Sequence, residues 1–336
     1  MKRKYIYSLL LLLIYCGCGR NQSLVPITKT RFLMDTLVEI SVYNKDIPED
    51  SVSALIDEAF AQIAYFDSLY NNYNEYSYVT YINNNAFNKT VRIDSGLMNL
   101  LTTSIRVSEL SNGAFDITIA PVIDVWNFGG DTPKVPEERV IQETLKQTGY
   151  KSLKAANNTV RFLKQGMKID LGGIAKGYVV DRAISLLVKH GITDAMINAG
   201  GDIKIICGEL TEEKRSVWIR HPRKRDKLFG RFQMDTGSVA TSGDYERFFM
   251  SDSVRYHHII DPKTGYSAKG CVSVTIVADN LMIADAYATA VFVLGPDAGF
   301  GFIERMPDVE GIIIYEKNNG LSYKVSSGLI DKFRPD

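Results

Sequence analysis

The sequence has few cysteines and histidines and no excess charge of either sign, and each shortage narrows what the chain can do. Only four cysteines and four histidines occur among 336 residues. Lysine plus arginine and aspartate plus glutamate are both 39, so the formal net charge is zero. This balance gives no reason to expect nucleic acid, or an acidic membrane surface, as the main partner. The composition, 45% hydrophobic and 23% charged, is that of a globular chain able to bury a core.

Two of the cysteines lie in the body of the chain. Cys207 ends the apolar run 203–207, and Cys271 begins the apolar run 271–277. Thiols in such runs are expected to be buried and free rather than joined in a disulfide. Two sulfurs without a neighbouring histidine cluster also argue against a zinc site.

The other two cysteines lie in an N-terminal segment typical of secretion signals. The basic residues 2–4 precede the apolar run 8–15, which is too short to span a bilayer. A cysteine directly after such a run resembles a bacterial lipobox, in which the cysteine is lipidated and becomes the mature N-terminus. Cys18 is the better candidate because small Gly17 precedes it, whereas Cys16 follows bulky Tyr15. The alternative is a plain cleaved signal peptide.

We therefore expect a lipoprotein signal peptide at 1–17, a polar tether at 18–30 and a single domain at 31–336. No repeat, low-complexity segment or proline- or serine-rich linker divides the body of the chain. The protein is expected to be exported and lipid-anchored to a bacterial membrane, on its periplasmic or outer face.

Apolar periodicity predicts the main helices and strands. Helices are expected over 50–68, 97–105, 137–147, 178–190 and 281–293. Strands are expected over 32–42, 160–169, 271–278, 311–315 and 322–325, and on both sides of the turn 198–202. The asparagine-rich stretch 70–85 is expected to be a loop, and 241–245 a turn. Because strands and helices alternate irregularly, an α+β fold fits better than a doubly wound α/β fold.

A glycine-rich stretch, Asp170 to Tyr178, separates the run 160–169 from the helical pattern that follows. Two glycines permit close backbone approach, and Lys176 stands where a helix would begin. Free N–H groups and the positive end of a helix suit an anion. The spacing matches neither a Walker A loop nor the Rossmann fingerprint. Taken alone, these residues favour a tight turn that packs a helix on a sheet.

Asp285 and Thr289 lie four residues apart in an otherwise small and apolar helical segment, so they share one face. An aspartate there is costly to bury unless it is paired or binds a metal. A carboxylate and a hydroxyl suit Mg²⁺, which prefers oxygen ligands and keeps positions for water and phosphate. The alternative is an aspartate that faces solvent and a threonine that bonds to its own backbone.

Two adjacent histidines, His257 and His258, are half of those in the chain. Within a strand they face opposite ways, so at most one lines a given site. A histidine titrates near neutral pH and can serve as a general base. A structural or exposed histidine is the commoner outcome.

Eight short motifs, in order along nearly the whole mature chain, resemble those of the ApbE family, FAD:protein FMN transferases that are often bacterial lipoproteins. Each motif is weak alone, but eight in order are specific. They lie at 34–36, 77–83, 112–118, 170–178, 198–202, 241–243, 258–262 with Gly265, and 285–290. The chain departs from the family at Asp35, where glycine is more usual, and it matches only loosely over 70–85.

The resemblance implies an ApbE/T-fold-like core of mixed, largely antiparallel sheets with packed helices. It also implies a reaction in which FAD is cleaved at its pyrophosphate and FMN passes to a threonine or serine hydroxyl of an acceptor protein, releasing AMP. The pyrophosphate oxygens need a divalent cation, here Mg²⁺, to neutralise charge in the transition state. With an exported anchor, a redox protein on the outward face of the membrane is the expected acceptor.

The resemblance also implies which residues bind metal and FAD. The expected Mg²⁺ ligands are Asp285, Thr289 and the backbone carbonyl of Gly173. The expected FAD contacts are Met34, Tyr70, Ala114, Phe115, Asp116, Asp170, Lys176 and Ile259. Among them, Lys176 would offset phosphate charge and Asp170 would bond a polar edge of the nucleotide. For the general base we expect His258, with Asp244 or a metal-bound hydroxide as alternatives.

Two other functions stay open from the sequence. A metal-dependent FAD pyrophosphatase would use the same metal chemistry, with water in place of the protein hydroxyl, and give free FMN and AMP. A lipid-anchored flavin-binding protein would catalyse nothing. Asp285 and Thr289 speak against that last function, because a binder has no need of a Mg²⁺ pair at the pyrophosphate.

Overall fold

The structure, a computed structural model, describes residues 25–130, 133–208, 214–318 and 320–336. The expected signal peptide and Cys18 lie outside these residues. The first strand begins at Ile27, inside the stretch 18–30 that was expected to be a tether. Among the described residues, none of the helices combines the length and the apolar character needed to cross a membrane.

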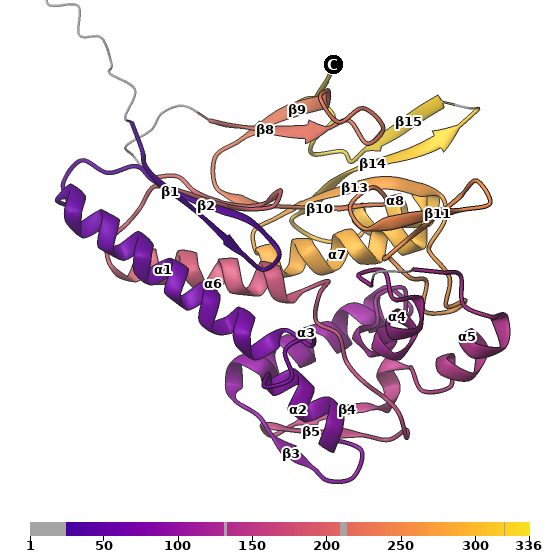
Figure 1. The fold of residues 1–336 in the computed structure, drawn as a ribbon. Coiled ribbons are helices and arrows are strands. Elements are labelled where there is room, and N and C mark those ends of the chain that lie inside the picture. The colour runs from indigo at the N-terminus through magenta and orange to yellow at the C-terminus, as the bar shows by residue number, and fades with distance from the viewer. Residues whose placement is uncertain (1–24, 131–132, 209–213, 319) are drawn as a thin grey trace, which may run out of the picture.

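An eight-stranded sheet forms the centre of the molecule (Figure 1), and all its neighbouring strands are antiparallel. In sheet order, the strands are β1 (Ile27–Leu33), β2 (Thr36–Val42), β6 (Ala195–Ala199), β7 (Asp202–Ile206), β10 (Gly237–Gly243), β13 (Cys271–Ala278), β14 (Val309–Lys317) and β15 (Gly320–Val325). The sheet is built largely from hairpins, which confirms the α+β class expected from the sequence.

Helices cover one face of this sheet and a small second sheet covers the other. In Figure 1, α1 (Glu49–Tyr70), α6 (Ala175–Lys189) and α7 (Leu281–Leu294) lie along one face. The second sheet consists of β8 (Arg215–Arg220), β9 (Leu228–Met234) and β16 (Arg334–Pro335), and it packs through Val217 and Phe232 onto Ile205 and Ile312. Seven of the eight residues of β13 are buried, which explains its continuous apolar sequence.

The remaining elements lie outside these layers; most lie below α1, α6 and α7 in Figure 1, and the last helix packs against α7 and β14. They are α2 (Tyr78–Asn85), β3 (Val91–Arg92), α3 (Ser95–Leu110), α4 (Ala120–Trp126), α5 (Glu138–Leu145), β4 (Leu153–Ala156), β5 (Thr159–Phe162), β11 (Phe248–Ser251), β12 (Val254–His257) and α8 (Pro296–Ile303), with short 3₁₀ turns at Ile117–Ile119 and Tyr150–Ser152. Trp126, Ile141 and Ile260 form a separate small core under α4 and α5.

The five expected helices are all present, but four loop and strand assignments were wrong. The stretch 32–42 is a hairpin, because Met34 and Asp35 have φ of 53° and 57°, a left-handed turn that no local apolar signal announces. The loop 70–85 contains α2, whose N-cap Ser77 accepts a hydrogen bond from the Thr80 amide at 3.0 Å.

The other two corrections concern 160–169 and 241–245. Only Thr159–Phe162 of the first run is a strand, so Asp170 follows an irregular segment rather than a strand end. In the second, residues 241–243 belong to β10, and the turn begins at Asp244. Small polar residues signal a turn locally, but here pairing with β13 extends the strand.

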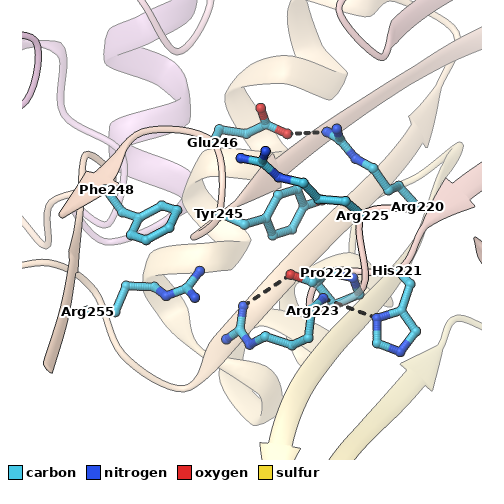
Figure 2. Close-up of a pocket in the computed structure, with 9 residues that line it drawn as sticks. All are labelled: Arg220, His221, Pro222, Arg223, Arg225, Tyr245, Glu246, Phe248 and Arg255. Carbon is cyan, nitrogen blue, oxygen red and sulfur yellow. Dashed lines mark hydrogen bonds and ion pairs between the residues drawn. The ribbon is translucent and has the colours of Figure 1, made fainter. Parts of the chain in front are cut away.

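Cys271 is buried and free, as expected, whereas Cys207 is only partly buried. A cavity of about 280 Å³ lies between the β8–β9 connection and the segment that follows β10 (Figure 2). It is lined mainly by arginine and aromatic side chains.

Candidate active site

Helices α6 and α7 hold each other by exchanging caps. Asp285, in the second turn of α7, accepts a hydrogen bond from the Gly177 amide at the start of α6 at 3.1 Å. In return, Asp181 of α6 accepts from the amides of Leu281 and Met282, the first two residues of α7, at 3.2 and 2.9 Å. These carboxylates satisfy amides that helix starts leave unpaired, and the exchange fixes where Asp285 lies.

Two glycines let the loop and the helices come this close. A Cβ at Gly177 would clash with the Leu281 carbonyl, so only glycine permits this crossing of α6 and α7. A Cβ at Gly173 would lie 3.3 Å from the Thr289 hydroxyl and 3.2 Å from the Phe115 ring. The glycine-rich stretch therefore lies directly against the face of α7 that carries Asp285 and Thr289.

Two carboxylates and one ammonium group gather at this point. The Lys176 Nζ lies 2.6 Å from Asp202, the first residue of β7, which is only 3% exposed. Burial, and next the charge of Asp202, raise the pKa of Asp285 to about 7. Burial acts to lower the pKa of Lys176, but Asp202 and Asp285 together raise it. One lysine does not neutralise both acids, so the cluster has room for a further positive charge.

The groups around Asp285 are oxygen donors suited to a hard cation. The Thr289 hydroxyl lies 3.4 Å from the Ser242 hydroxyl on β10. The sequence did not single out Ser242 as a metal ligand. Within the described residues, no group of three or more His, Cys, Asp or Glu side chains is placed to hold a metal ion. A cation bound here would have one carboxylate and hydroxyl oxygens as ligands, and such donors fit Mg²⁺ better than a transition metal.

Most amides of the glycine-rich stretch already have partners. Gly172 donates to the Asp170 side chain at 2.6 Å, and Ile174 and Ala175 both donate to the Leu171 carbonyl. Asp170 itself also accepts from Asn72 at 3.0 Å. The stretch is thus held from within by its own hydrogen bonds and does not present an open ring of amides to a ligand.

His258 lies beside the site with one ring nitrogen engaged. Its Nδ1 is 3.3 Å from the Arg247 carbonyl, and since a carbonyl only accepts, this nitrogen carries the proton. The Nε2 lone pair is then available to take a proton. Desolvation, together with Arg247 and His257, lowers the pKa of His258 to about 4, so the ring is neutral at physiological pH.

Asp244 and His257 are placed differently from His258. Arg223 binds both Asp244 oxygens, at 2.6 and 2.7 Å, and Asp244 is only 6% exposed. His257 is buried, with its Nε2 3.0 Å from the Ala268 carbonyl. The two histidines do face different surroundings, and the carboxylate of Asp244 is committed to an ion pair.

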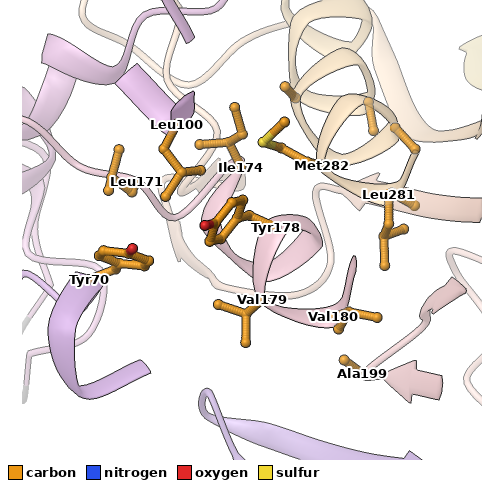
Figure 3. Close-up of a cluster of buried hydrophobic side chains, with 14 of the residues drawn as sticks. Tyr70, Leu100, Leu171, Ile174, Tyr178, Val179, Val180, Ala199, Leu281 and Met282 are labelled. Carbon is orange, nitrogen blue, oxygen red and sulfur yellow. The ribbon is translucent and has the colours of Figure 1, made fainter. Parts of the chain in front are cut away.

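The structure separates two tyrosines at the end of α1. Tyr70 is buried, and its ring lies 5.7 Å from that of Phe66 and 6.0 Å from that of Tyr178 (Figure 3). Tyr73, in contrast, is 68% exposed, and the charges of Asp170 and Arg247 act on its hydroxyl. Sequence reasoning named Tyr70 and did not consider Tyr73, and the end of α1 at Tyr70 lies between them.

Met34 lies at the β1–β2 turn, which Arg247 links to His258. Its amide donates to Asp67 at 3.3 Å, and the Asp35 carboxylate lies 3.4 Å from the Arg247 guanidinium. The family's usual glycine at position 35 suits the positive φ found here, and the aspartate adopts that conformation while pairing with Arg247.

The motif Ala114-Phe115-Asp116 is buried next to the glycine-rich stretch. Asp116 accepts from the Thr118 amide at 2.8 Å and from the Tyr150 amide at 2.9 Å, so its carboxylate organises the turn around it. The following Ile117 carbonyl accepts from the Asp170 amide at 2.8 Å. Ile259 is also buried, and its carbonyl accepts from the Ala268 amide. These bonds tie the motif to the glycine-rich stretch and fix the backbone around it.

Comparison with known families and proteins gives consistent matches. The model of the ApbE family matches residues 34–313. A FAD:protein FMN transferase of Treponema pallidum is 32% identical over 346 residues, which cover 96% of this chain and 94% of the relative. A protein of the same name from Klebsiella pneumoniae is 30% identical, over 84% of this chain and 87% of the relative.

Solved structures agree with the sequence matches. The ApbE protein of Thermotoga maritima superposes with a TM-score of 0.84 at 33% identity, over 92% of this chain and 99% of the other. The flavin transferase ApbE of Vibrio cholerae also gives 0.84, at 25% identity over 92% of this chain and 100% of the other. The similarity thus covers most of the chain, and the residues matched by the family model include both α6 and α7.

Proposed function

The chain belongs to the ApbE family and is a flavin transferase, and we propose that it moves FMN from FAD to a threonine or serine hydroxyl of an acceptor protein with the help of Mg²⁺. AMP is the second product. The observation that carries the metal part of this proposal is the cluster of Asp285, Asp202 and Lys176, whose acids outnumber its cation beside the Thr289 hydroxyl.

Mg²⁺ would be held by the Asp285 carboxylate, the Thr289 hydroxyl and the Gly173 carbonyl. When bound there, it would supply positive charge to the pyrophosphate oxygens as the bond between the two phosphates breaks. The remaining positive charge comes from Lys176, whose raised pKa keeps it protonated throughout the physiological range. Its ion pair with Asp202 fixes the ammonium group in place.

The proposed transfer is a single displacement at phosphorus. The acceptor hydroxyl oxygen forms a bond to the phosphorus of the FMN half, the bridging P–O bond breaks, and AMP leaves with the bridging oxygen. The hydroxyl proton passes to Nε2 of His258, which is neutral and free to accept it. Asp244 is the weaker candidate for the base, because Arg223 occupies both of its oxygens.

FAD would lie beside the β1–β2 turn, the segment after α1 and the glycine-rich stretch. We propose that Tyr73, rather than buried Tyr70, stacks on the flavin, because an exposed ring offers its face at the cost of little reorganisation. Met34 lies on the same side. The backbone around Ala114–Asp116 and Ile259 would line the nucleotide, with Asp170 holding the loop in place.

Anchoring at Cys18 and an outward-facing location remain proposals from the sequence alone. An anchored transferase would meet acceptor redox proteins at the membrane surface, where the tether limits its reach. Globomycin treatment of expressing cells should make an unprocessed precursor accumulate, whereas Cys18→Ser should release the protein from membranes. A protein that stays membrane-bound after Cys18→Ser would refute this anchor.

A single incubation tests the reaction. The purified protein is mixed with FAD, Mg²⁺ and candidate membrane redox subunits, and the products are followed by in-gel flavin fluorescence, intact mass and AMP release. The proposal predicts a mass increase equal to FMN attached through a phosphoester, with one AMP released per adduct. Release of AMP without an adduct would mean a FAD pyrophosphatase, and neither product would mean a flavin-binding protein.

A further inference from the structure

The turn between β1 and β2 holds a charged side chain where the backbone favours glycine. Asp35 has φ of 57°, in the left-handed region that glycine adopts freely and that few other residues tolerate. Its side chain is 70% exposed, so burial does not compensate for this conformation. What the aspartate offers in place of glycine is therefore its negative charge.

The charge of Asp35 pairs with Arg247, which lies in the segment between β10 and β11. The carboxylate Oδ2 is 3.4 Å from Nη2 of the guanidinium, and the two residues are 212 positions apart in the chain. In the central sheet, β6 and β7 separate β2 from β10, so this contact joins two parts of the sheet that are not neighbours. Both side chains are more than half exposed, and such pairs contribute little to folding stability. The consequence of the pair should therefore lie in the position of Arg247.

The backbone of Arg247 in turn orients His258. The Arg247 carbonyl accepts two hydrogen bonds from this residue, one from the backbone amide at 3.0 Å and one from Nδ1 at 3.3 Å. The second bond lies just beyond the common range of such bonds, so a small shift of the carbonyl would release the ring. While both bonds hold, Nδ1 keeps its proton and Nε2 is the nitrogen with a free lone pair. The position of Arg247 thus decides whether His258 presents a base.

The β1–β2 turn has a second attachment that does not involve the Asp35 side chain. The Met34 amide donates a hydrogen bond to Asp67 of α1 at 3.3 Å. Loss of the Asp35 carboxylate would leave this bond in place and would free only Arg247. The two attachments therefore allow the position of Met34, an expected FAD contact, to be separated by mutation from the position of His258.

We propose that Asp35 is a positioning residue for FMN transfer. Its carboxylate holds Arg247 where the backbone carbonyl of that residue keeps the His258 ring oriented, with Nε2 free to take the proton of the acceptor hydroxyl. This inference rests on the role of His258 in the proposed function. Because an exposed ion pair biases such an arrangement only modestly, the expected effect on the rate is a few-fold.

Substitutions at position 35 test this role without disturbing the fold. Asp35→Gly suits the left-handed backbone, Asp35→Asn keeps the shape of the side chain without its charge, and Asp35→Glu keeps the charge. Asp308→Gly is the matched control, because Asp308 is also exposed, has φ of 57° and, within the described part of the chain, forms no ion pair. All four variants should have melting temperatures close to that of the wild type.

The rate of AMP release is measured in the incubation described above, at saturating FAD and Mg²⁺. In about 0.1 M NaCl, Asp35→Gly and Asp35→Asn should lower kcat about threefold to fivefold, whereas Asp35→Glu and Asp308→Gly should retain it. In about 1 M NaCl the Debye length falls from about 10 Å to about 3 Å, so kcat of the wild type should approach that of Asp35→Asn. The dissociation constant of FAD should stay near the wild-type value in every variant, because Asp67 still holds Met34.

A measurement without FAD separates this inference from the transfer function. Proton–nitrogen correlation spectra of the histidine rings report which ring nitrogen carries the proton, and His258→Gln identifies the signals of His258. The wild type should show the Nδ1-protonated form, and Asp35→Asn a mixture of both tautomers.

Identical tautomers, equal kcat at the lower salt concentration, or a loss of kcat that persists unchanged at the higher one would each overturn the proposal. AMP release without an adduct would refute transfer by this protein. A lower kcat for AMP release in Asp35→Asn, restored in Asp35→Glu, would still support the role of Asp35 in that case.

Discussion

Strand β10 separates two clusters of opposite charge imbalance. On the side of α7, Asp202 and Asp285 share one lysine. Beyond the end of the strand, four arginines share three carboxylates. The chain as a whole is neutral, so neither imbalance shows in its composition. The difference teaches that a neutral chain can leave charge of opposite sign unpaired in two places, and we propose that a cation completes the acidic cluster at Asp285.

The largest effect should come from removing the acid of the first cluster. Asp285→Asn keeps an oxygen for the Gly177 amide but removes the charge, so FMN transfer should fall about a thousandfold, the scale for losing one preorganised electrostatic contact. Asp297→Asn is the matched control, since Asp297 is exposed and pairs only with Lys324 on the surface. Similar transfer rates for Asp285→Asn and wild type would show that the acidic cluster does not need the charge of Asp285.

His258→Ala should cost roughly a hundredfold to a thousandfold in the transfer rate, because it removes the proposed general base. The dissociation constant of FAD, measured by flavin fluorescence, should change little. His257→Ala is a poor control because that ring is buried, so His190→Ala, on an exposed helix end, is used instead. Equal losses of FAD binding and of transfer would assign His258 a role in binding rather than in proton transfer.

The pH dependence of folding stability tests the protonation of Asp285 in the acidic cluster. In the metal-free protein the pKa of Asp285, about 7, exceeds the value near 3.9 of an unfolded chain. Between these values the folded state retains a proton that the unfolded state has lost. Stability attributable to Asp285 therefore falls as pH rises from about 4 to 7, by up to about 1.4 kcal/mol per pH unit.

Urea unfolding of wild type and Asp285→Asn at pH 5 and pH 7 measures this slope as a difference between the two proteins. The wild type should lose stability relative to the variant at the higher pH, and Mg²⁺ should restore it, because the cation binds the deprotonated acid. Parallel pH profiles for the two proteins would contradict the raised pKa.

The smallest effect on FAD binding is expected from Tyr73, the exposed tyrosine after the end of α1. Tyr73→Ala should weaken FAD binding by roughly threefold to tenfold, the value of one aromatic stacking contact, with an unchanged melting temperature. Tyr70→Ala should instead lower stability by about 3 kcal/mol or more, because it opens a cavity in the core. Calorimetry and flavin titration of both variants would reveal the opposite pattern if Tyr70 were the flavin contact.

The sequence allowed the helices and the Asp285/Thr289 pair to be predicted because their evidence is local. A carboxylate four residues from a hydroxyl in an apolar helix requires a partner wherever that helix packs. The family motif likewise allowed the contact between the glycine-rich stretch and α7 to be predicted. These signals depend on spacing within one segment, and spacing is visible in a sequence.

The partners that complete both clusters were not predictable in this way. Asp202 meets Lys176 because α6 packs against β6 and β7, and the arginine cavity joins β8–β9 to β12. Tyr70 and Tyr73 differ by three residues, and the end of α1 decides which of them is buried. Such outcomes depend on tertiary packing between segments far apart in the sequence, or on one helix boundary.

The most direct test of the central claim, a divalent cation at Asp285, is a calorimetric titration of Mg²⁺ into the protein with FAD present. The wild type and Asp297→Asn should bind one Mg²⁺ per chain, and Asp285→Asn should show no binding in the same concentration range. Equal stoichiometry and affinity in Asp285→Asn and wild type would contradict the account.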